Sequence, residues 1–192
     1  MMIDGIYSDP NHVIAGSFGG LRAIARSGDE VVCLGCDDGE NWWTLLGKFS
    51  NETDLTIDFS PKAPRVGNLA ASVVEGALKF ADGNAWVKLK EGDAFGVDPA
   101  PKGLQGVYRD ASNPGFKGLR FVSNRLGKVE SDKVTILATD DGLTFKAFQG
   151  GSVADGKVLC QTGILDANLT DTGAIAGWTK LQPAGNPHAL IN

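Results

Sequence analysis

The chain has 192 residues and a formal net charge of −5, with 42% hydrophobic and 21% charged residues. This is an ordinary globular composition, and the length suits one large domain or two small, closely packed ones. The acidic balance, with no Lys/Arg block longer than two residues, argues against nucleic acid or an anionic membrane as partner, because phosphate binding needs clustered cations. No run of about 18 apolar residues is present, so we expect no membrane span.

The cysteine count and the N-terminus indicate the compartment. Three cysteines cannot form a closed disulfide set, which favours a reducing compartment over secretion. The first five residues lead directly into a structural motif, with no basic and then apolar leader. We therefore expect a cytoplasmic protein, or a protein shown without its leader.

Residues 5–89 consist of short alternating runs that end at turns. In residues 21–26, for example, Leu21, Ala23 and Ala25 share one face and both arginines lie on the other. The turns are rich in Gly, Asp, Asn and Pro, which favour the backbone angles of a chain reversal. The pattern predicts strands within residues 6–7, 21–26, 30–36, 42–49, 53–59, 76–80 and 86–89, with a less regular piece at 69–74.

Residues 106–181 repeat this skeleton as a second copy. Residues 90–105 form the expected linker, and residues 182–192 form a C-terminal tail outside the repeat. The second copy has no counterpart of the DFSPK segment at residues 58–62 and offers residues 158–164 and 166–169 instead. Its last turn is Thr172-Gly173-Ala174 where the first copy has Asp82-Gly83-Asn84. The matches are GIYSD at 5–9 with GVYRD at 106–110, GLR at 20–22 with GLR at 118–120, and DDG at 37–39 with DDG at 140–142.

The fold is predicted to be all-β, since no amphipathic helix of three turns is found. We expect two pseudo-symmetric copies, each of five or six short antiparallel strands. Three arrangements remain open: packed sheets, two small barrels, or one continuous barrel.

Cys33 and Cys36 form a C-x-x-C motif, a spacing known from zinc and redox sites. Only Cys160, His12 and His188 remain to complete a metal site. On a strand, residues three apart point to opposite faces, and no helix N-terminus is predicted that would lower a thiol pKa. We expect two buried structural cysteines and no metal or other cofactor.

The two Asp-Asp-Gly turns invite a calcium hypothesis, because carboxylates suit a hard cation. A calcium loop needs five or more oxygens in a tight run, and Asp37-Asp38-Gly39 supplies two carboxylates. Hairpin-turn chemistry therefore accounts for them.

Two groupings invite a catalytic hypothesis: His12 with Asp9 and Ser8, and Ser60 near Asp58. A triad needs a nucleophile, a base and an orienting group within mutual reach, and no nucleophile elbow is present. A loop histidine without a catalytic role is the favoured interpretation.

The adjacent Trp42 and Trp43 must point to opposite faces of a strand. Core packing against Trp86 accounts for one of them, and the outward one is a candidate for stacking on a sugar or docking a protein. Arg22 and Arg120 occupy matching positions and either pair with Asp9 and Asp110 or line an anion pocket; the salt bridge is favoured. The candidate ligand or partner surface comprises Trp42, Trp43, Trp86, Trp178, Arg22, Arg120 and His12.

Several motifs together resemble a tandem β-repeat family of photosynthetic algae that includes the pyrenoid shell proteins of diatoms. They are Y-x-D-P-N-H at 7–12, G-L-R at 20–22, D-D-G-x-x-W at 37–42, D-F-S-P-K at 58–62 and D-G-N-x-W-x-K-L at 82–89. The resemblance implies two β-rich regions, a C-terminal tail and assembly into protein sheets around Rubisco. It also implies the plastid stroma, if a leader is missing. The second copy matches less completely, which leaves any role of its missing motifs open.

The leading hypothesis is a non-enzymatic structural protein that self-associates into a sheet or higher oligomer through its two β copies and its tail. The alternative is a lectin-like or small-ligand-binding β-barrel module. A third, weaker hypothesis is a small isomerase or lyase that uses Arg22 and His12 inside a barrel.

Overall fold

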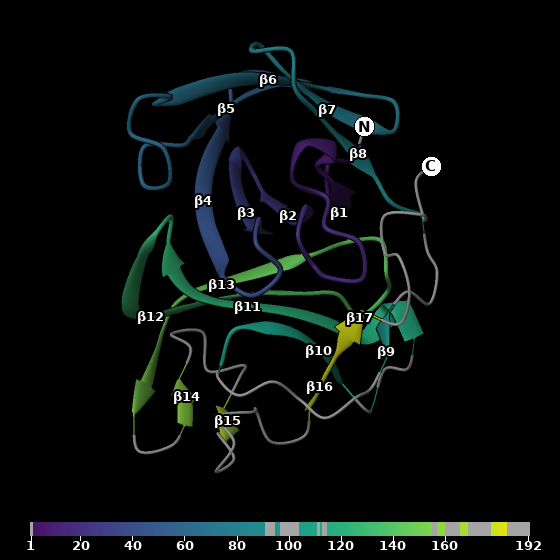
Figure 1. Ribbon diagram of the computed structural model, residues 1–192, viewed down its shortest axis with the longest axis vertical. Helices are drawn as coiled ribbons and strands as arrows, with labels where there is room; N and C mark the ends of the chain where they lie inside the picture. Colours follow the sequence, from purple (N-terminus) through teal and green to yellow (C-terminus); the bar gives the residue numbers. More distant parts are fainter. Residues whose placement is uncertain are drawn as a thin grey trace.

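The computed structural model describes residues 2–90, 95–96, 104–110, 112, 115–154, 157–159, 166–168 and 178–183. Within these ranges the protein consists of β-strands and two short 3-10 helices, which confirms the all-β class (Figure 1). None of the described helices is long and apolar enough to cross a membrane. Most of the expected linker, tail residues 184–192, the turn at residues 172–174, Cys160 and His188 lie outside the described residues.

The first part of the chain, residues 5–89, closes into an antiparallel barrel. Each strand pairs with the next along the chain, and the last strand returns to pair with the first. The ring contains eight strands rather than five or six, because the short first and last strands and residues 68–74 are all needed to close it. The strands are β1 (Gly5–Ser8), β2 (Leu21–Ser27), β3 (Glu30–Cys36), β4 (Trp42–Phe49), β5 (Asp54–Asp58), β6 (Asn68–Val74), β7 (Ala77–Phe80) and β8 (Ala85–Lys88), with the 3-10 helix η1 (Pro10–His12) after β1.

Side chains fill the interior of this barrel, as the size of an eight-stranded ring requires. Ile24 and Leu45 are fully buried there, and three aromatic rings pack at one end. Phe80 lies 4.7 Å from Trp86 and Phe59 lies 6.3 Å from Trp86, centroid to centroid, both in edge-on contacts. The barrel is therefore a packed core rather than an open channel.

The second part, residues 106–181, is a run of antiparallel strands ordered β16-β10-β11-β12-β13-β14-β15. A short parallel pairing of Leu126 in β11 with Thr44 in β4 joins it to the barrel. Tyr108 lies opposite Arg120 on the neighbouring strand, just as Tyr7 lies opposite Arg22. Among the described residues no strand joins β15 to β16, so this sheet has two unpaired edges. Its elements are β10 (Gly106–Asp110), η2 (Gly115–Gly118), β11 (Leu119–Leu126), β12 (Val129–Ala138), β13 (Lys146–Ala154), β14 (Lys157–Leu159), β15 (Asp166–Asn168) and β16 (Trp178–Lys180), while β9 (Phe95–Gly96) pairs with β17 (Gln182–Pro183).

The two parts lie against each other along a seam (Figure 1). Side chains from both parts form one hydrophobic core there. The outer face of β2, carrying Leu21, Ala23 and Ala25, is buried there against β12 and β13. In return β11 packs on β3 and β4. Phe121 of β11 lies 5.6 Å from Trp42 of β4, ring centroid to ring centroid. The alternation in residues 21–26 therefore supplies two cores, one inside the barrel and one between the parts.

The turn of the β11–β12 hairpin lies on the DFSPK segment of the first part. Gly127 donates its N–H to the Thr44 carbonyl at 3.1 Å, and Lys128 donates its N–H to the Pro61 carbonyl at 3.2 Å. Gly127 has a φ of +57°, and a Cβ added there would lie 2.1 Å from the carbonyl carbon of Pro61. Both the backbone angle and the close approach require glycine at this contact.

We predict that Gly127→Ala destabilises the protein more than Gly76→Ala. Gly76 has a similar φ of +69° but no atom within 4 Å of an added Cβ, so its substitution costs only the backbone strain, about 1–2 kcal/mol. Gly127→Ala adds a steric clash of roughly 1–3 kcal/mol. Urea unfolding of both variants measures the difference, and equal losses would show that the hairpin does not need this contact.

Candidate functional site

Arg22 lies at one end of the first barrel and is completely buried. Its Nη1 donates to the carbonyls of Leu21 at 2.9 Å and Cys36 at 2.7 Å. Its Nη2 donates to Asp9 Oδ2 at 2.8 Å and Asp37 Oδ1 at 2.7 Å. The ion pair with Asp9 is the one that the sequence predicts, whereas the second partner, Asp37, is a new finding.

The strand register makes room for this guanidinium. Arg22 lies opposite Gly35 on β3, and Gly35 lies opposite Trp43 on β4. A Cβ on Gly35 would lie 2.8 Å from Arg22 Cδ and 2.3 Å from the Trp43 ring. The guanidinium carbon lies 4.8 Å from the Trp43 ring centroid and 5.3 Å from that of Trp86. The charge is therefore held by two carboxylates and two aromatic faces.

Asp9 links Arg22 to the helix η1. Its Oδ1 accepts the backbone N–H of Asn11 at 3.1 Å, and its Oδ2 accepts from His12 Nδ1 at 2.9 Å. Because a carboxylate only accepts, the proton of this bond belongs to Nδ1. Burial raises the pKa of Asp9, but Arg22 and the bonds from His12 and Asn11 together bring that pKa below its usual value.

Asp37 is shared between two cations. Besides Arg22, it pairs through Oδ2 with Lys62 Nζ at 2.6 Å, and that ammonium lies 4.4 Å from the Trp43 centroid. Burial raises the pKa of Asp37, but Arg22 and Lys62 lower that pKa by more, so it lies below its usual value. Turn chemistry thus accounts for only one carboxylate of the first Asp-Asp-Gly. Asp38 Oδ1 accepts the turn N–H groups of residues 40 and 41, but Asp37 is an ion-pair partner, which corrects the turn-only interpretation.

Asn84, directly before β8, completes the group, because β8 lies beside β1. Its Oδ1 accepts from Asn11 Nδ2 at 2.9 Å, and its Nδ2 lies 3.4 Å from Asp9 Oδ1. Four motifs that are far apart in the sequence therefore meet here: DPNH at 9–12, DDG at 37–39, DFSPK at 58–62 and DGN at 82–84.

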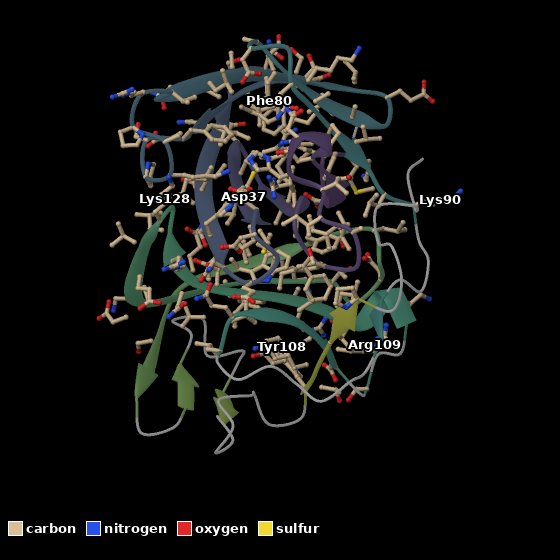
Figure 2. All side chains as sticks on the ribbon, in the orientation of Figure 1. Asp37, Phe80, Lys90, Tyr108, Arg109 and Lys128 are labelled. Carbon is tan, nitrogen blue, oxygen red and sulfur yellow. The ribbon has the colours of Figure 1, made fainter. Side chains whose placement is uncertain are left out.

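These motifs and the β11–β12 hairpin surround a cavity of about 410 Å³, here called the barrel-mouth cavity. Its lining is polar in part, with His12, Lys62 and Lys128, and apolar in part, with Phe80 and Trp86. Figure 2 labels three of the lining residues, with Phe80 high in the barrel, Asp37 nearer the seam and Lys128 beside the tip of the hairpin.

The second part repeats the arginine cluster in a more open form. Arg120 donates to the Leu119 and Thr139 carbonyls, to Asp110 Oδ2 at 3.1 Å and to Asp140 Oδ1 at 2.7 Å. The Asp140 side chain is 57% exposed, against 25% for its counterpart Asp37. The DFSPK segment, which covers the first cluster through Lys62, explains the difference.

The tryptophans do not form the surface that the sequence suggests. Trp43 points into the barrel and Trp42 points out of it, as alternation requires, but they are only 5% and 1% exposed. The second part covers Trp42, so the prediction of an outward tryptophan available to a ligand is wrong. Trp86 is buried in the barrel, and Trp178 is half-buried over Arg120, 5.7 Å from its guanidinium carbon.

Cys33 and Cys36 are both free and buried, as expected. Cys33 lies inside the barrel and Cys36 in the seam, so the two thiols face different cores. Burial raises the pKa of each thiol to about 12, which suppresses thiolate chemistry. The described residues contain no group of three or more His, Cys, Asp or Glu side chains that would hold a metal ion.

Arg22 and His12 do not form a shared reaction chamber. His12 lines the barrel-mouth cavity. Arg22 does not line it, because its side chain is completely buried against its partners. The arrangement required by the isomerase or lyase hypothesis, with both side chains in one cavity, is not formed. Comparison with protein-family models, curated proteins and solved structures finds no match. The functional interpretation therefore rests on the geometry of the site.

Sequence reasoning missed three residues of the site: Asp37, Lys62 and Asn84. Asp37 was assigned to a turn, and the other two were noticed only as members of motifs. The signal was the motif set itself, because every segment of it contributes a side chain to this one end of the barrel.

We predict that Arg22→Leu lowers the free energy of unfolding by about 3–5 kcal/mol, because it leaves two carboxylates partly buried without their cation. Arg65→Leu, at an exposed arginine of the same barrel, is the control and should change stability by less than about 0.5 kcal/mol. Adding Asp37→Asn to Arg22→Leu should recover part of the loss. Equal effects of the two single substitutions in thermal and urea unfolding would contradict the role of the cluster.

We also predict that the cluster makes the protein acid-sensitive. The folded-state pKa values of Asp9 and Asp37 are lowered, so their contribution to stability is complete above the unfolded value of about 3.9. That contribution is lost as the pH falls from about 5 through the folded-state values. Asp37→Asn should therefore show a smaller stability loss on acidification than the unaltered protein, with Asp29→Asn in an exposed turn as control. Parallel pH curves for all three would contradict the prediction.

Proposed function

We propose that this is a non-enzymatic structural protein that associates with copies of itself through its two β-rich parts and its C-terminal tail. By the resemblance of its motifs, the assembly is a shell or sheet around a Rubisco condensate. The observation that supports the proposal is that the motif residues bind to one another inside the protein. Arg22, Asp9 and Asp37 are engaged with one another and with the backbone, in a role that stabilises the barrel rather than one that acts on a substrate.

We further propose that the two parts arose by duplication. The matched pairs Tyr7–Arg22 and Tyr108–Arg120, and the arginine cluster in each part, support this origin. Two related but unequal parts give one chain two similar but different surfaces. Contacts between unlike surfaces are those that extend into lattices rather than closing as dimers.

The edges of the second sheet support the same proposal. The first barrel is closed and has no free edge, whereas β15 and β16 have no outer neighbour among the described strands. Unpaired strand edges are templates for another chain. Val129 and Leu143, in the second part, are 67% and 63% exposed and add apolar surface for contacts between copies.

Particle size tests the proposal directly. Light scattering coupled to chromatography, with electron microscopy of the same fractions, should show the full chain as large oligomers or sheets whose fraction rises with concentration. A chain ending at Pro183 should form smaller particles, because residues 184–192 no longer reach a neighbour. A Gly/Ser replacement of equal length at 184–192 controls for chain length. A stable monomer at every concentration would overturn the proposal.

A second candidate function is supported by one observation, the barrel-mouth cavity of about 410 Å³ with its polar and apolar sides. The size is in the range of small-molecule sites. A lectin-like mode in which a sugar stacks on Trp42 or Trp43 has no support, because both rings are buried. The candidate is therefore a β-barrel module that binds a small ligand at this mouth.

A further inference from the structure

The barrel-mouth cavity is built from both parts of the chain. Residues of η1, β6, β7, β8 and the DFSPK segment line it from the first part, and Lys128 lines it from the second. The bond from the Lys128 N–H to the Pro61 carbonyl fixes that wall. The cavity is therefore a feature of the docked molecule, not of the barrel alone.

Most of the carboxylate oxygens at this cavity are engaged within the protein. Asp9 accepts through both oxygens, from Arg22, His12 and the Asn11 N–H. The two oxygens of Asp37 accept from Arg22 and from Lys62. Asn84 Oδ1 accepts from Asn11 Nδ2 and from the N–H of residue 85. On the rim, Asp82 retains one oxygen that no described group engages.

Two ammonium groups at this cavity keep donors that no described residue engages. The Lys62 ammonium has three N–H groups and one anionic partner, Asp37. The exposed Lys128 ammonium makes no ion pair with any described residue. A molecule that binds to these ammonium groups must accept hydrogen bonds.

A neighbouring cavity of about 380 Å³ shares Asp37, Lys62 and Lys128 with the barrel-mouth cavity. The two lysines therefore line both cavities.

Lys62 shares its one carboxylate partner with another cation. Asp37 is shared with Arg22, so it neutralises Lys62 only in part. Burial lowers the pKa of Lys62, and the attraction to Asp37 does not restore that pKa to its usual value. A second anion beside this ammonium would offset the cost of its burial.

Part of the cavity lining is apolar and specifies the rest of the ligand. The apolar lining residues are Phe59, Val66, Leu69, Phe80 and Trp86. We propose that the barrel-mouth cavity binds a small organic carboxylate, with its carboxylate between Lys62 and Lys128 and its apolar body against Phe80 and Trp86. Inorganic phosphate leaves the apolar lining uncovered, and a neutral sugar brings no negative charge to the two ammonium groups. The proposal rests on the second candidate function, a small-ligand-binding module, and not on self-assembly.

A matched pair of probes tests the carboxylate directly. Benzoate and benzamide have nearly the same size and shape, and only benzoate carries a charge. Titration calorimetry with the full chain should show benzoate binding in roughly the millimolar range or tighter, and at least about tenfold more tightly than benzamide. Tryptophan fluorescence should change with benzoate, because Trp86 lines the site. Inorganic phosphate should bind more weakly than benzoate.

Lysine variants locate the binding site. Lys62→Met should weaken benzoate binding by about tenfold, the value of a charge-assisted hydrogen bond. Lys128→Met, at an exposed position, should weaken it by about threefold. Lys79→Met is the matched control, an exposed lysine on β7 that does not line the cavity, and should leave binding unchanged. Circular dichroism and thermal unfolding check that each variant remains folded.

The possible outcomes separate the two proposals. Preferential benzoate binding that depends on Lys62 and Lys128 supports the carboxylate site. Equal binding of benzoate and benzamide overturns the carboxylate assignment while the ligand-binding function stands. Absence of binding by either probe up to roughly 10 mM overturns both. Should Lys62→Met fail to fold, the comparison of Lys128→Met with Lys79→Met decides the location alone.

Discussion

The first barrel depends on the pairing of the buried Arg22 guanidinium with Asp9 and Asp37. A charge removed from water is costly unless it is paired and hydrogen-bonded. Arg22 is paired with Asp9 and Asp37 and donates to two backbone carbonyls, and these partners come from three segments of the chain, at residues 9, 21 and 36–37. Among the described residues, only its buried Nε–H finds no hydrogen-bond partner. Because each segment must be in place before the charge is satisfied, the cluster fixes how the loops at this end of the barrel are arranged.

The DFSPK segment then connects this cluster to the second part of the chain. Lys62 covers Asp37, while the carbonyl of Pro61, one residue earlier, accepts the N–H of Lys128. One short loop thus caps the first arginine cluster and receives the β11–β12 hairpin. Its absence from the second copy leaves Asp140 more exposed than Asp37, and the asymmetry between the two copies becomes an asymmetry of surface.

The sequence predicted most of the strands but did not predict which side chains are exposed to solvent. Alternation placed Leu21, Ala23 and Ala25 on one face and separated Cys33 from Cys36, because the two-residue period of a strand is a local property. The same rule correctly pointed Trp42 and Trp43 in opposite directions. It did not show that the outward ring would be covered, because that depends on how the two parts dock.

The sequence by itself therefore determined the all-β class, the turns and the pairing of Arg22 with Asp9, all of which follow from local periodicity, turn chemistry and charge. Only the tertiary structure decided that the first part closes as its own barrel, that both parts share a core, and that Asp37, Lys62 and Asn84 meet at one mouth. The physical reason is barrel closure, which brings β8 beside β1 and so joins residues some 75 positions apart, such as Asn84 and Asp9. Such proximity is set by long-range strand pairing, which no local pattern encodes.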